Sequence, residues 1–181
     1  MASADRRTVL LYVGVGAAAL IAGVTATVWR GRMRGAEDDD AVSALFAQTL
    51  ADADGTPRSL AQWRGTPVIV NFWATWCEPC VREMPDLQRL SETYASRGVQ
   101  VLGLAIDEPA RIRGFRDQLQ LTLPLFAAAA AGSELMRALG NGSGALPYTV
   151  LIGRTGSVLW RHLGQIDPEH LRKELDVAVA P

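Results

Sequence analysis

The two cysteines are the residues whose type and spacing most directly indicate chemistry. Cys77 and Cys80 are the only cysteines in the 181 residues, and Glu78 and Pro79 separate them. A Cys-x-x-Cys pair that follows an apolar strand and begins a helix is typical of a thiol–disulfide redox centre. Free backbone N–H groups and the positive end of the helix dipole stabilise a thiolate at Cys77. Cys80, one helical turn further on, then faces back and can close a disulfide.

A zinc site and a pair of inert buried thiols are the alternative interpretations of the two cysteines. Structural zinc usually takes four Cys or His ligands, and the chain offers only two histidines, His162 and His170, beside the pair. The histidines lie far along the chain and do not have the spacing of zinc ligands. Both alternatives stay open beside the redox interpretation.

Two elements must position the pair. Val68–Trp73 is a continuous apolar run, β-branched at its start, as is expected of a strand buried on both faces. The segment Val81–Tyr94 predicts a helix, because apolar residues recur at helical spacing at Met84, Leu87, Leu90 and Tyr94. Pro79 falls in the first turn of this helix, where its missing N–H costs nothing.

The remaining pattern alternates strands with helices and closes with a hairpin and a helix. Strands are expected at residues 44–50, 56–60, 99–106, 123–126, 149–152 and 157–163, and helices at 110–119, 133–139 and 168–179. Asp54-Gly55 is a turn dipeptide between the first two strands. The order predicts an α/β fold with a central mixed β-sheet flanked by helices and an N-terminal β-hairpin extension.

The N-terminal segment predicts contact with a membrane. Residues 9–28 contain no charge, and twenty residues in a helix span a bilayer core of about 30 Å. We therefore expect residues 1–30 to be a membrane anchor with a single transmembrane helix, or a cleavable signal segment. Residues 31–43, with the acidic run at 37–40, are expected to be a linker, and residues 44–181 the redox domain. Arginines flank the apolar run on both sides, so the positive-inside rule does not orient it.

The charge pattern argues against nucleic acid as a partner. The formal net charge is −1, and both signs are interspersed along the globular part. A basic stripe or arm would be needed to neutralise phosphates. With two cysteines in the chain, disulfides are not the framework of the fold.

These motifs resemble the membrane-anchored TlpA/ResA-like thiol–disulfide oxidoreductases of the thioredoxin-fold superfamily. The resemblance covers residues 44–180 and rests on four segments: Asn71–Cys80, Glu83–Pro85, Leu146–Thr149 and the hairpin around Arg154–Gly156. It implies a thioredoxin-like fold in which Pro147 is a cis proline packed against the cysteines. It also implies that the N-terminal segment anchors the domain outside the cytoplasm.

The resemblance implies a proton-handling role for Glu83, close to the pair. Cys77 is expected to attack a partner's disulfide, and Cys80 to resolve the mixed disulfide. Thioredoxin has a buried aspartate where this chain has Asn71, and an asparagine cannot titrate. Glu83 is therefore the expected proton acceptor, with a surface glutamate as the alternative.

Other residues near the pair are expected to position a partner or to set the redox poise. Glu78 opposes ionisation of its neighbour Cys77, which favours a reducing pair, although a merely solvated residue at the helix start is the alternative. Pro79, the second residue between the two cysteines, is expected to set the redox poise together with Glu78. The backbone of Leu146 is expected to pair with an extended partner segment, and Trp76 to contact the partner.

Together these features predict a protein-disulfide reductase, single-pass in the cytoplasmic (inner) membrane, with its redox domain facing the periplasm or cell exterior. It is expected to use no metal and no cofactor beyond the Cys77–Cys80 disulfide. By resemblance its partners are apocytochrome c or copper-assembly proteins, and a membrane thiol reductant is the electron donor. A disulfide oxidant or isomerase, and a copper(I)-binding assembly module using the same cysteines with Met84 nearby, remain alternatives. The peroxidatic pattern Pro-x-x-x-Thr-x-x-Cys is absent.

Overall fold

The computed structural model describes residues 35–179 and every second residue from 23 to 33. The chain divides into two units, Met1–Glu37 and Asp38–Pro181, and the fold below is that of the second. The anchor expected at residues 9–28 lies largely outside the described residues. Among the residues that are described, no helix is both long enough and apolar enough to cross a membrane.

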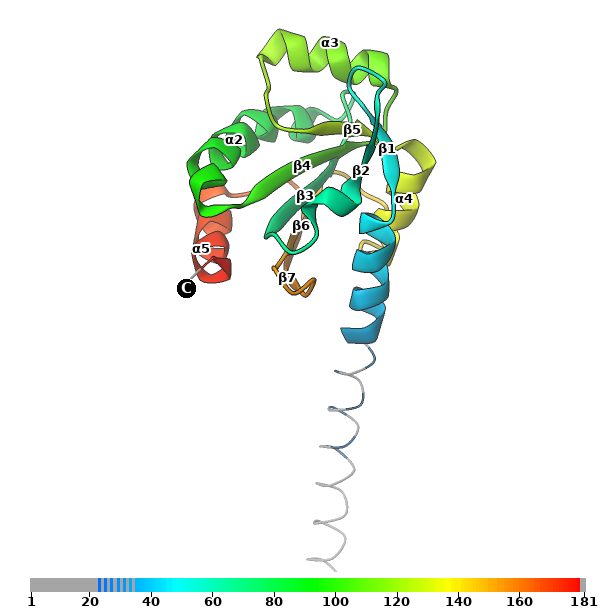
Figure 1. Ribbon diagram of the computed structural model, residues 1–181, viewed down its shortest axis with the longest axis vertical. Coiled ribbons are helices and arrows are strands. Elements are labelled where there is room, and N and C mark those ends of the chain that lie inside the picture. The colour runs from blue at the N-terminus through cyan, green and yellow to red at the C-terminus, as the bar shows by residue number, and fades with distance from the viewer. Residues whose placement is uncertain are drawn as a thin grey trace, which may run out of the picture. The chain divides into compact units, whose positions relative to one another are not determined.

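The described strands form a single seven-stranded sheet, ordered β2-β1-β5-β4-β3-β6-β7 (Figure 1). The strands β3, β4 and β5 run parallel, whereas β1, β2, β6 and β7 pair antiparallel with their neighbours. The predicted mixed sheet is thus confirmed. The strand bounds are β1 Thr49–Asp52, β2 Pro57–Ser59, β3 Val68–Trp73, β4 Gln100–Ala105, β5 Leu125–Ala127, β6 Tyr148–Ile152 and β7 Val158–Leu163.

Helices cover both faces of this sheet (Figure 1). The helices that follow β2 are, in chain order, η1 Leu60–Trp63, α2 Glu78–Tyr94, η2 Ala95–Arg97, α3 Pro109–Leu119, α4 Ala129–Ala138 and α5 Pro168–Ala178. The helix α5 starts where the Asp167 side chain accepts hydrogen bonds from the next free N–H groups, with a proline in the first turn. At the end of η2, Gly98 takes a left-handed conformation with φ of 76°, which suits a residue without a Cβ.

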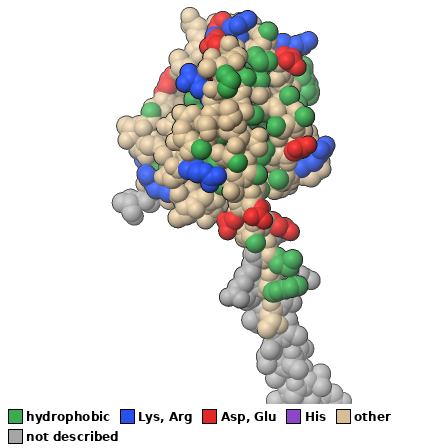
Figure 2. Space-filling view, turned by 45° about the vertical axis from the view of Figure 1, so that its right-hand side comes forward, with side chains coloured by type: hydrophobic (Ala, Val, Ile, Leu, Met, Phe, Trp, Pro, Cys, Tyr) green, Lys and Arg blue, Asp and Glu red, His purple; other side chains and the backbone are tan. Residues whose placement is uncertain are grey.

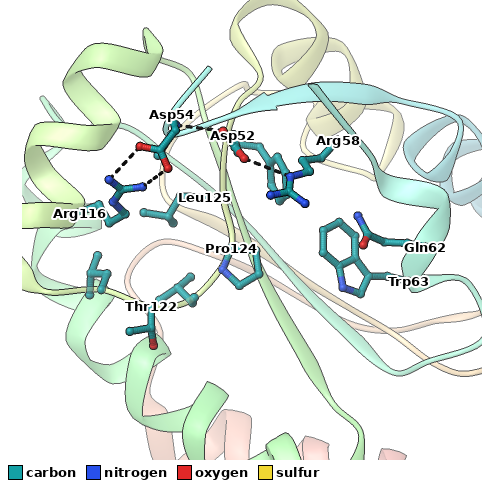
Figure 3. Close-up of a pocket in the computed structure, with 13 residues that line it drawn as sticks. Asp52, Asp54, Arg58, Gln62, Trp63, Arg116, Thr122, Pro124 and Leu125 are labelled. Carbon is teal, nitrogen blue, oxygen red and sulfur yellow. Dashed lines mark hydrogen bonds and ion pairs between the residues drawn. The ribbon is translucent and has the colours of Figure 1, made fainter. Parts of the chain in front are cut away.

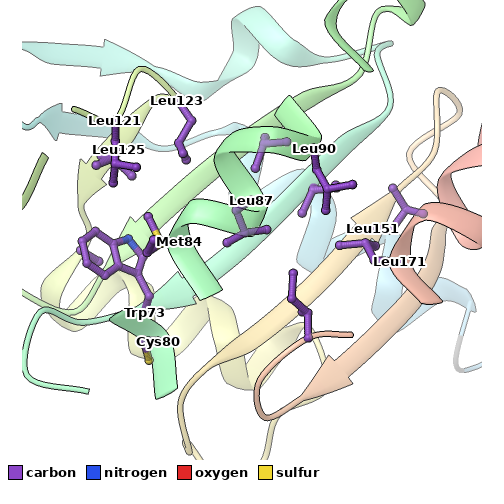
Figure 4. Close-up of a cluster of buried hydrophobic side chains, with 14 of the residues drawn as sticks. Trp73, Cys80, Met84, Leu87, Leu90, Leu121, Leu123, Leu125, Leu151 and Leu171 are labelled. Atoms are coloured by element: carbon purple, nitrogen blue, oxygen red, sulfur yellow. The ribbon is translucent and has the colours of Figure 1, made fainter. Parts of the chain in front are cut away.

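The central strand β3 is buried on both faces, as its apolar run predicts. Ile69 and Trp73 point into one hydrophobic cluster, while Val68, Val70 and Phe72 point into the other, which is the period of two expected for a strand. Figure 4 shows the first cluster, where Met84 of α2 lies next to Trp73. Leu87 and Leu90 follow along α2 toward Leu151 of β6 and Leu171 of α5. This packing holds α2 against the sheet.

The segment before β1 differs from the expectation. Residues 35–46 are helical, so the strand expected at 44–50 is wrong at its start, and β1 begins at Thr49. The compact unit begins at Asp38, inside the expected linker. Four apolar residues at helical spacing drive this difference, since their side chains are buried in the second cluster: Ala41, Val42, Leu45 and Phe46.

Candidate active site

The predicted cysteine pair forms a disulfide at the start of α2. Cys77 is the N-cap residue, with extended backbone, and the helix begins at Glu78. The two Cα atoms lie 5.3 Å apart, within the range that a disulfide spans. Cys77 is 7% exposed, whereas Cys80 is fully buried. The geometry therefore places Cys77 nearer to solvent and to the free N–H groups of the helix.

The loop that delivers Cys77 is fastened to the neighbouring strand by an aspartate. Asp107 Oδ2 accepts hydrogen bonds from the Thr75 N–H at 3.2 Å and from the Thr75 hydroxyl at 2.5 Å. Asp107 follows β4, which runs parallel to β3, and the carboxyl ends of parallel strands meet at one edge of a sheet. Asp107 is not among the predicted site residues, although its place at the end of a buried strand is a usable signal.

The Leu146–Pro147 peptide bond is cis, as the resemblance implies. In the antiparallel ladder between β3 and β6, Phe72 pairs with Tyr148. The cis bond precedes Tyr148 by one residue, so it lies beside the end of β3, where the cysteine loop begins. The elements expected to form the site therefore converge at one edge of the sheet.

Glu83 lies in the core one helical turn past Cys80, with no exposed surface. Its Oε1 accepts a hydrogen bond from Asn71 Nδ2 at 2.7 Å, and its Oε2 accepts one from the Ile166 backbone N–H at 2.9 Å. Burial raises the pKa of Glu83 to about 7, although the two hydrogen bonds act in the opposite direction. The expectation of a titrating carboxyl group behind the cysteines fits this geometry, and the surface alternative is wrong.

Asn71 is the direct hydrogen-bond partner of Glu83. Its Nδ2 also donates to Thr149 Oγ1 at 3.0 Å, so β3 and β6 both contribute to the site. The Oδ1 atom of Asn71 is buried and has no hydrogen-bond partner among the described residues. An amide at this position can donate to a carboxylate and, after rotation, accept from a carboxylic acid.

The remaining predicted site residues lie at the surface around the disulfide. Glu78 is exposed and forms an ion pair with Arg82, one turn along α2. Pro79 occupies the first turn. Trp76 is 64% exposed and borders an open pocket of about 540 Å³, whose other lining residues are Ile106, Asp107, Glu108, Arg111, Ala129, Ala130 and Ser133. The exposed indole ring and the pocket therefore lie beside the loop that leads into Cys77.

A second pocket, of about 280 Å³, does not include any of the predicted site residues. It lies between the β1–β2 hairpin, η1 and the segment that leads into β5 (Figure 3). Two ion pairs line it, Arg58 with Asp52 and Arg116 with Asp54. Because its charges are already paired with one another, this pocket offers no unbalanced charge to a ligand.

The surface charges and the place of Met84 bear on the nucleic-acid and copper interpretations. On the face shown in Figure 2, Lys and Arg side chains are scattered rather than gathered in a stripe. Within the described part of the chain, no group of three or more His, Cys, Asp or Glu side chains is placed to hold a metal. Met84, the methionine nearest to the cysteines in sequence, is fully buried in the apolar cluster.

Comparison with known proteins agrees with this geometry. The model of the AhpC/TSA family matches residues 43–161. A thiol-disulfide oxidoreductase ResA from Geobacillus thermodenitrificans is 34% identical over 128 residues, covering 70% of this chain and 71% of that protein. ResA from Geobacillus kaustophilus is 33% identical over the same shares of both chains.

Solved structures show the same fold. The crystal structure of a thiol:disulfide interchange protein of the thioredoxin family from Chlorobium tepidum superposes with a TM-score of 0.63 at 29% identity, covering 74% of this chain and 93% of the other. The thioredoxin-like fold and the resemblance to ResA-like proteins are confirmed. The chain belongs to the AhpC/TSA family of thioredoxin-fold proteins, and it is a thiol–disulfide oxidoreductase.

Proposed function

We propose that the chain reduces disulfides of partner proteins, with no cofactor beyond its own Cys77–Cys80 disulfide. The observation that supports this direction is the carboxyl group of Glu83, buried one turn past Cys80 on the helix that holds the pair. Glu78 also lies beside Cys77, but its ion pair with Arg82 offsets its charge. A negative charge near a thiol disfavours the thiolate. A reduced pair whose thiolate is poorly stabilised gives up its electrons more readily, whereas DsbA is a strong oxidant because its reduced form is stabilised.

The reaction proceeds in two exchange steps. The Cys77 thiolate attacks one sulfur of the partner's disulfide; a mixed disulfide forms, and the partner's other sulfur leaves as a thiolate. Cys80 then attacks the sulfur of Cys77, which closes the intramolecular disulfide and releases the second partner thiolate. Glu83 accepts the proton that Cys80 loses, for which a carboxyl group with a pKa of about 7 is well suited. The partner gains two electrons, and the cysteine pair loses two.

The partner is bound at the edge where Trp76 and the cis peptide lie. An extended segment pairs with the backbone of Leu146 by β-augmentation and reaches the open pocket beside Trp76. Apocytochrome c and copper-assembly proteins are the proposed partners, because their cysteines must be reduced before they take a haem or a metal. A membrane thiol reductant re-reduces the pair.

The proposed location is the outer face of the cytoplasmic membrane, with residues 9–28 as a single-pass anchor. The support is the uncharged apolar run in the sequence. Fusion of alkaline phosphatase to the C-terminus of the full chain tests this topology, since the reporter is active only outside the cytoplasm. An active reporter in the membrane fraction is expected, and an inactive one contradicts the proposal.

The direction of the reaction is tested with one substrate that must be reduced and one that must be oxidised. With dithiothreitol as electron donor, catalytic amounts of the full chain are expected to accelerate the reduction of insulin. The oxidised chain is expected to refold reduced ribonuclease A no faster than glutathione disulfide does. Rapid oxidative refolding with slow insulin reduction contradicts a reductase and supports the oxidant alternative.

A further inference from the structure

A single peptide group connects His162 with the buried carboxyl group of Glu83. The Ile166 N–H donates to Glu83 Oε2 at 2.9 Å. The carbonyl group of that same peptide belongs to Gln165, and its oxygen lies 3.1 Å from His162 Nε2. The two ends of one amide are therefore occupied by two titratable side chains from different elements, β7 and α2.

The chemistry of this contact sets which nitrogen of His162 holds a proton. A carbonyl oxygen only accepts hydrogen bonds, so Nε2 must be the donor. Donation to the carbonyl polarises the amide and makes its N–H a stronger donor in turn, because hydrogen bonds in a chain reinforce one another. This stabilises the carboxylate form of Glu83, which accepts the hydrogen bond from that N–H.

Packing fixes the His162 ring and the loop that it contacts. The ring stacks on Trp160, with centroids 5.4 Å apart and planes 4° from parallel. Arg82 of α2 donates to the Gln165 side chain at 3.4 Å, so Gln165 is tied to two elements. The neighbouring Gly164 N–H donates to the Pro147 carbonyl at 2.8 Å. The loop between β7 and α5 thus joins the cis proline to Glu83.

We propose that His162 is a positioning residue for Glu83, acting through the peptide group that joins Gln165 to Ile166. The inference deepens the proposed function, because it concerns the group that takes the proton from Cys80. The imidazole keeps the Ile166 N–H directed at the Glu83 carboxyl group and makes this N–H a stronger hydrogen-bond donor. A chain without this donor keeps its proton on Glu83 to a higher pH.

Other charged and titratable groups surround this connection. On α2 the Asp86 charge raises the pKa of Glu83, and Arg82 is paired with Glu78. The facing groups of β3 and β6, the amide of Asn71 and the hydroxyl of Thr149, are neutral. From α5, the His170 ring meets the Trp160 ring edge-on, with centroids 5.9 Å apart, and its Nε2 lies 3.5 Å from Glu174 Oε1.

The test is a titration of the Glu83 carboxyl group by ¹³C NMR in the oxidised full chain, in which the cysteines do not titrate. The signal is assigned by its loss in Glu83→Gln. His162→Phe keeps a ring on Trp160 but removes the donor, and is expected to raise the pKa of Glu83 by about half a unit to one unit. His162→Gln restores an N–H donor without a charge and is expected to bring the pKa back toward that of the wild type.

His170→Phe is the matched control, because His170 contacts the same tryptophan ring. It is expected to leave the titration of Glu83 unchanged. An unchanged Glu83 pKa in His162→Phe overturns the proposal, even if this variant is less stable. An equal shift in His170→Phe also overturns it, since the effect would then come from packing. The titration does not depend on catalysis, so failure to reduce insulin would refute the proposed function and leave this inference standing.

Discussion

Glu83 and Asn71, both without exposed surface, are joined by a hydrogen bond of 2.7 Å between Oε1 and Nδ2. A carboxyl group in such a site costs free energy when it ionises, which is why its pKa is raised to about 7. The hydrogen bonds from the Asn71 amide and the Ile166 N–H stabilise the carboxylate, so the pKa of Glu83 stays within the physiological range of pH. The pair thus provides a proton acceptor that is poised near neutral pH without a second acid.

The raised pKa of Glu83 makes stability depend on pH. The folded chain retains the proton while the unfolded chain loses it near the ordinary value of 4.5, so stability is lost as the pH rises from about 4.5 to about 7. Glu83→Gln removes this loss. The change that the substitution makes in the free energy of unfolding should therefore be more favourable at pH 8 than at pH 5, by up to about 3 kcal/mol. Urea unfolding of the oxidised chain at both pH values measures the difference.

Glu134→Gln is the control for this experiment, since Glu134 is an exposed glutamate of α4. It should change stability by less than about 0.5 kcal/mol at either pH. An effect of Glu83→Gln that is the same at pH 5 and pH 8 would show that Glu83 ionises normally in the folded chain.

The two cysteines should differ in reactivity in the reduced chain. Cys77 lies at the helix start and is 7% exposed, whereas Cys80 has no exposed surface. Iodoacetamide should modify Cys77 at least about tenfold faster than Cys80, because thiolate character and access both favour it. Mass spectrometry of quenched samples gives the two rates.

The two cysteines should also differ in trapping a substrate. Cys80→Ser should accumulate a mixed disulfide with an oxidised substrate, and Cys77→Ser should not. The reverse pattern would exchange the two roles.

Trp76 should contribute to binding a protein partner but not to the exchange chemistry. Its side chain is 64% exposed beside Cys77, and an indole buried at an interface typically contributes more than about 1 kcal/mol. Trp76→Ala should lower kcat/KM for a protein disulfide by about tenfold, while its reaction with a small disulfide changes less than about twofold. Leu159→Ala, which removes an exposed side chain of β7, is the control. Equal losses with both substrates would mean that Trp76 supports the cysteine loop itself.

The parts of the site that sequence could predict are those that lie close together along the chain. Cys77 and Cys80 are three positions apart, and the apolar strand and the amphipathic helix on either side of them place both residues at a helix start. Glu83 lies one helical turn past Cys80, but its expected place near the pair and its proton role came from the resemblance. The cis conformation at Pro147 came from the resemblance alone.

The parts that could not be predicted depend on distant contacts. Ile166 lies 83 residues from Glu83 along the chain, and backbone N–H groups leave no mark in a sequence. The helix at residues 35–46 was missed for a different reason. The acidic run at its start favoured a solvated linker, although Ala41, Val42 and Leu45 have the spacing of a buried helix face.

The reduction potential of the Cys77–Cys80 pair is the most direct test of the proposal that the chain is a reductase. The full chain is equilibrated with thioredoxin of known potential, and the oxidised and reduced forms are quantified after alkylation. A reductase is expected to have a value near or below that of thioredoxin, about −270 mV. A value near −120 mV, about that of the strong oxidant DsbA, would contradict a reductase and reverse the direction of electron flow.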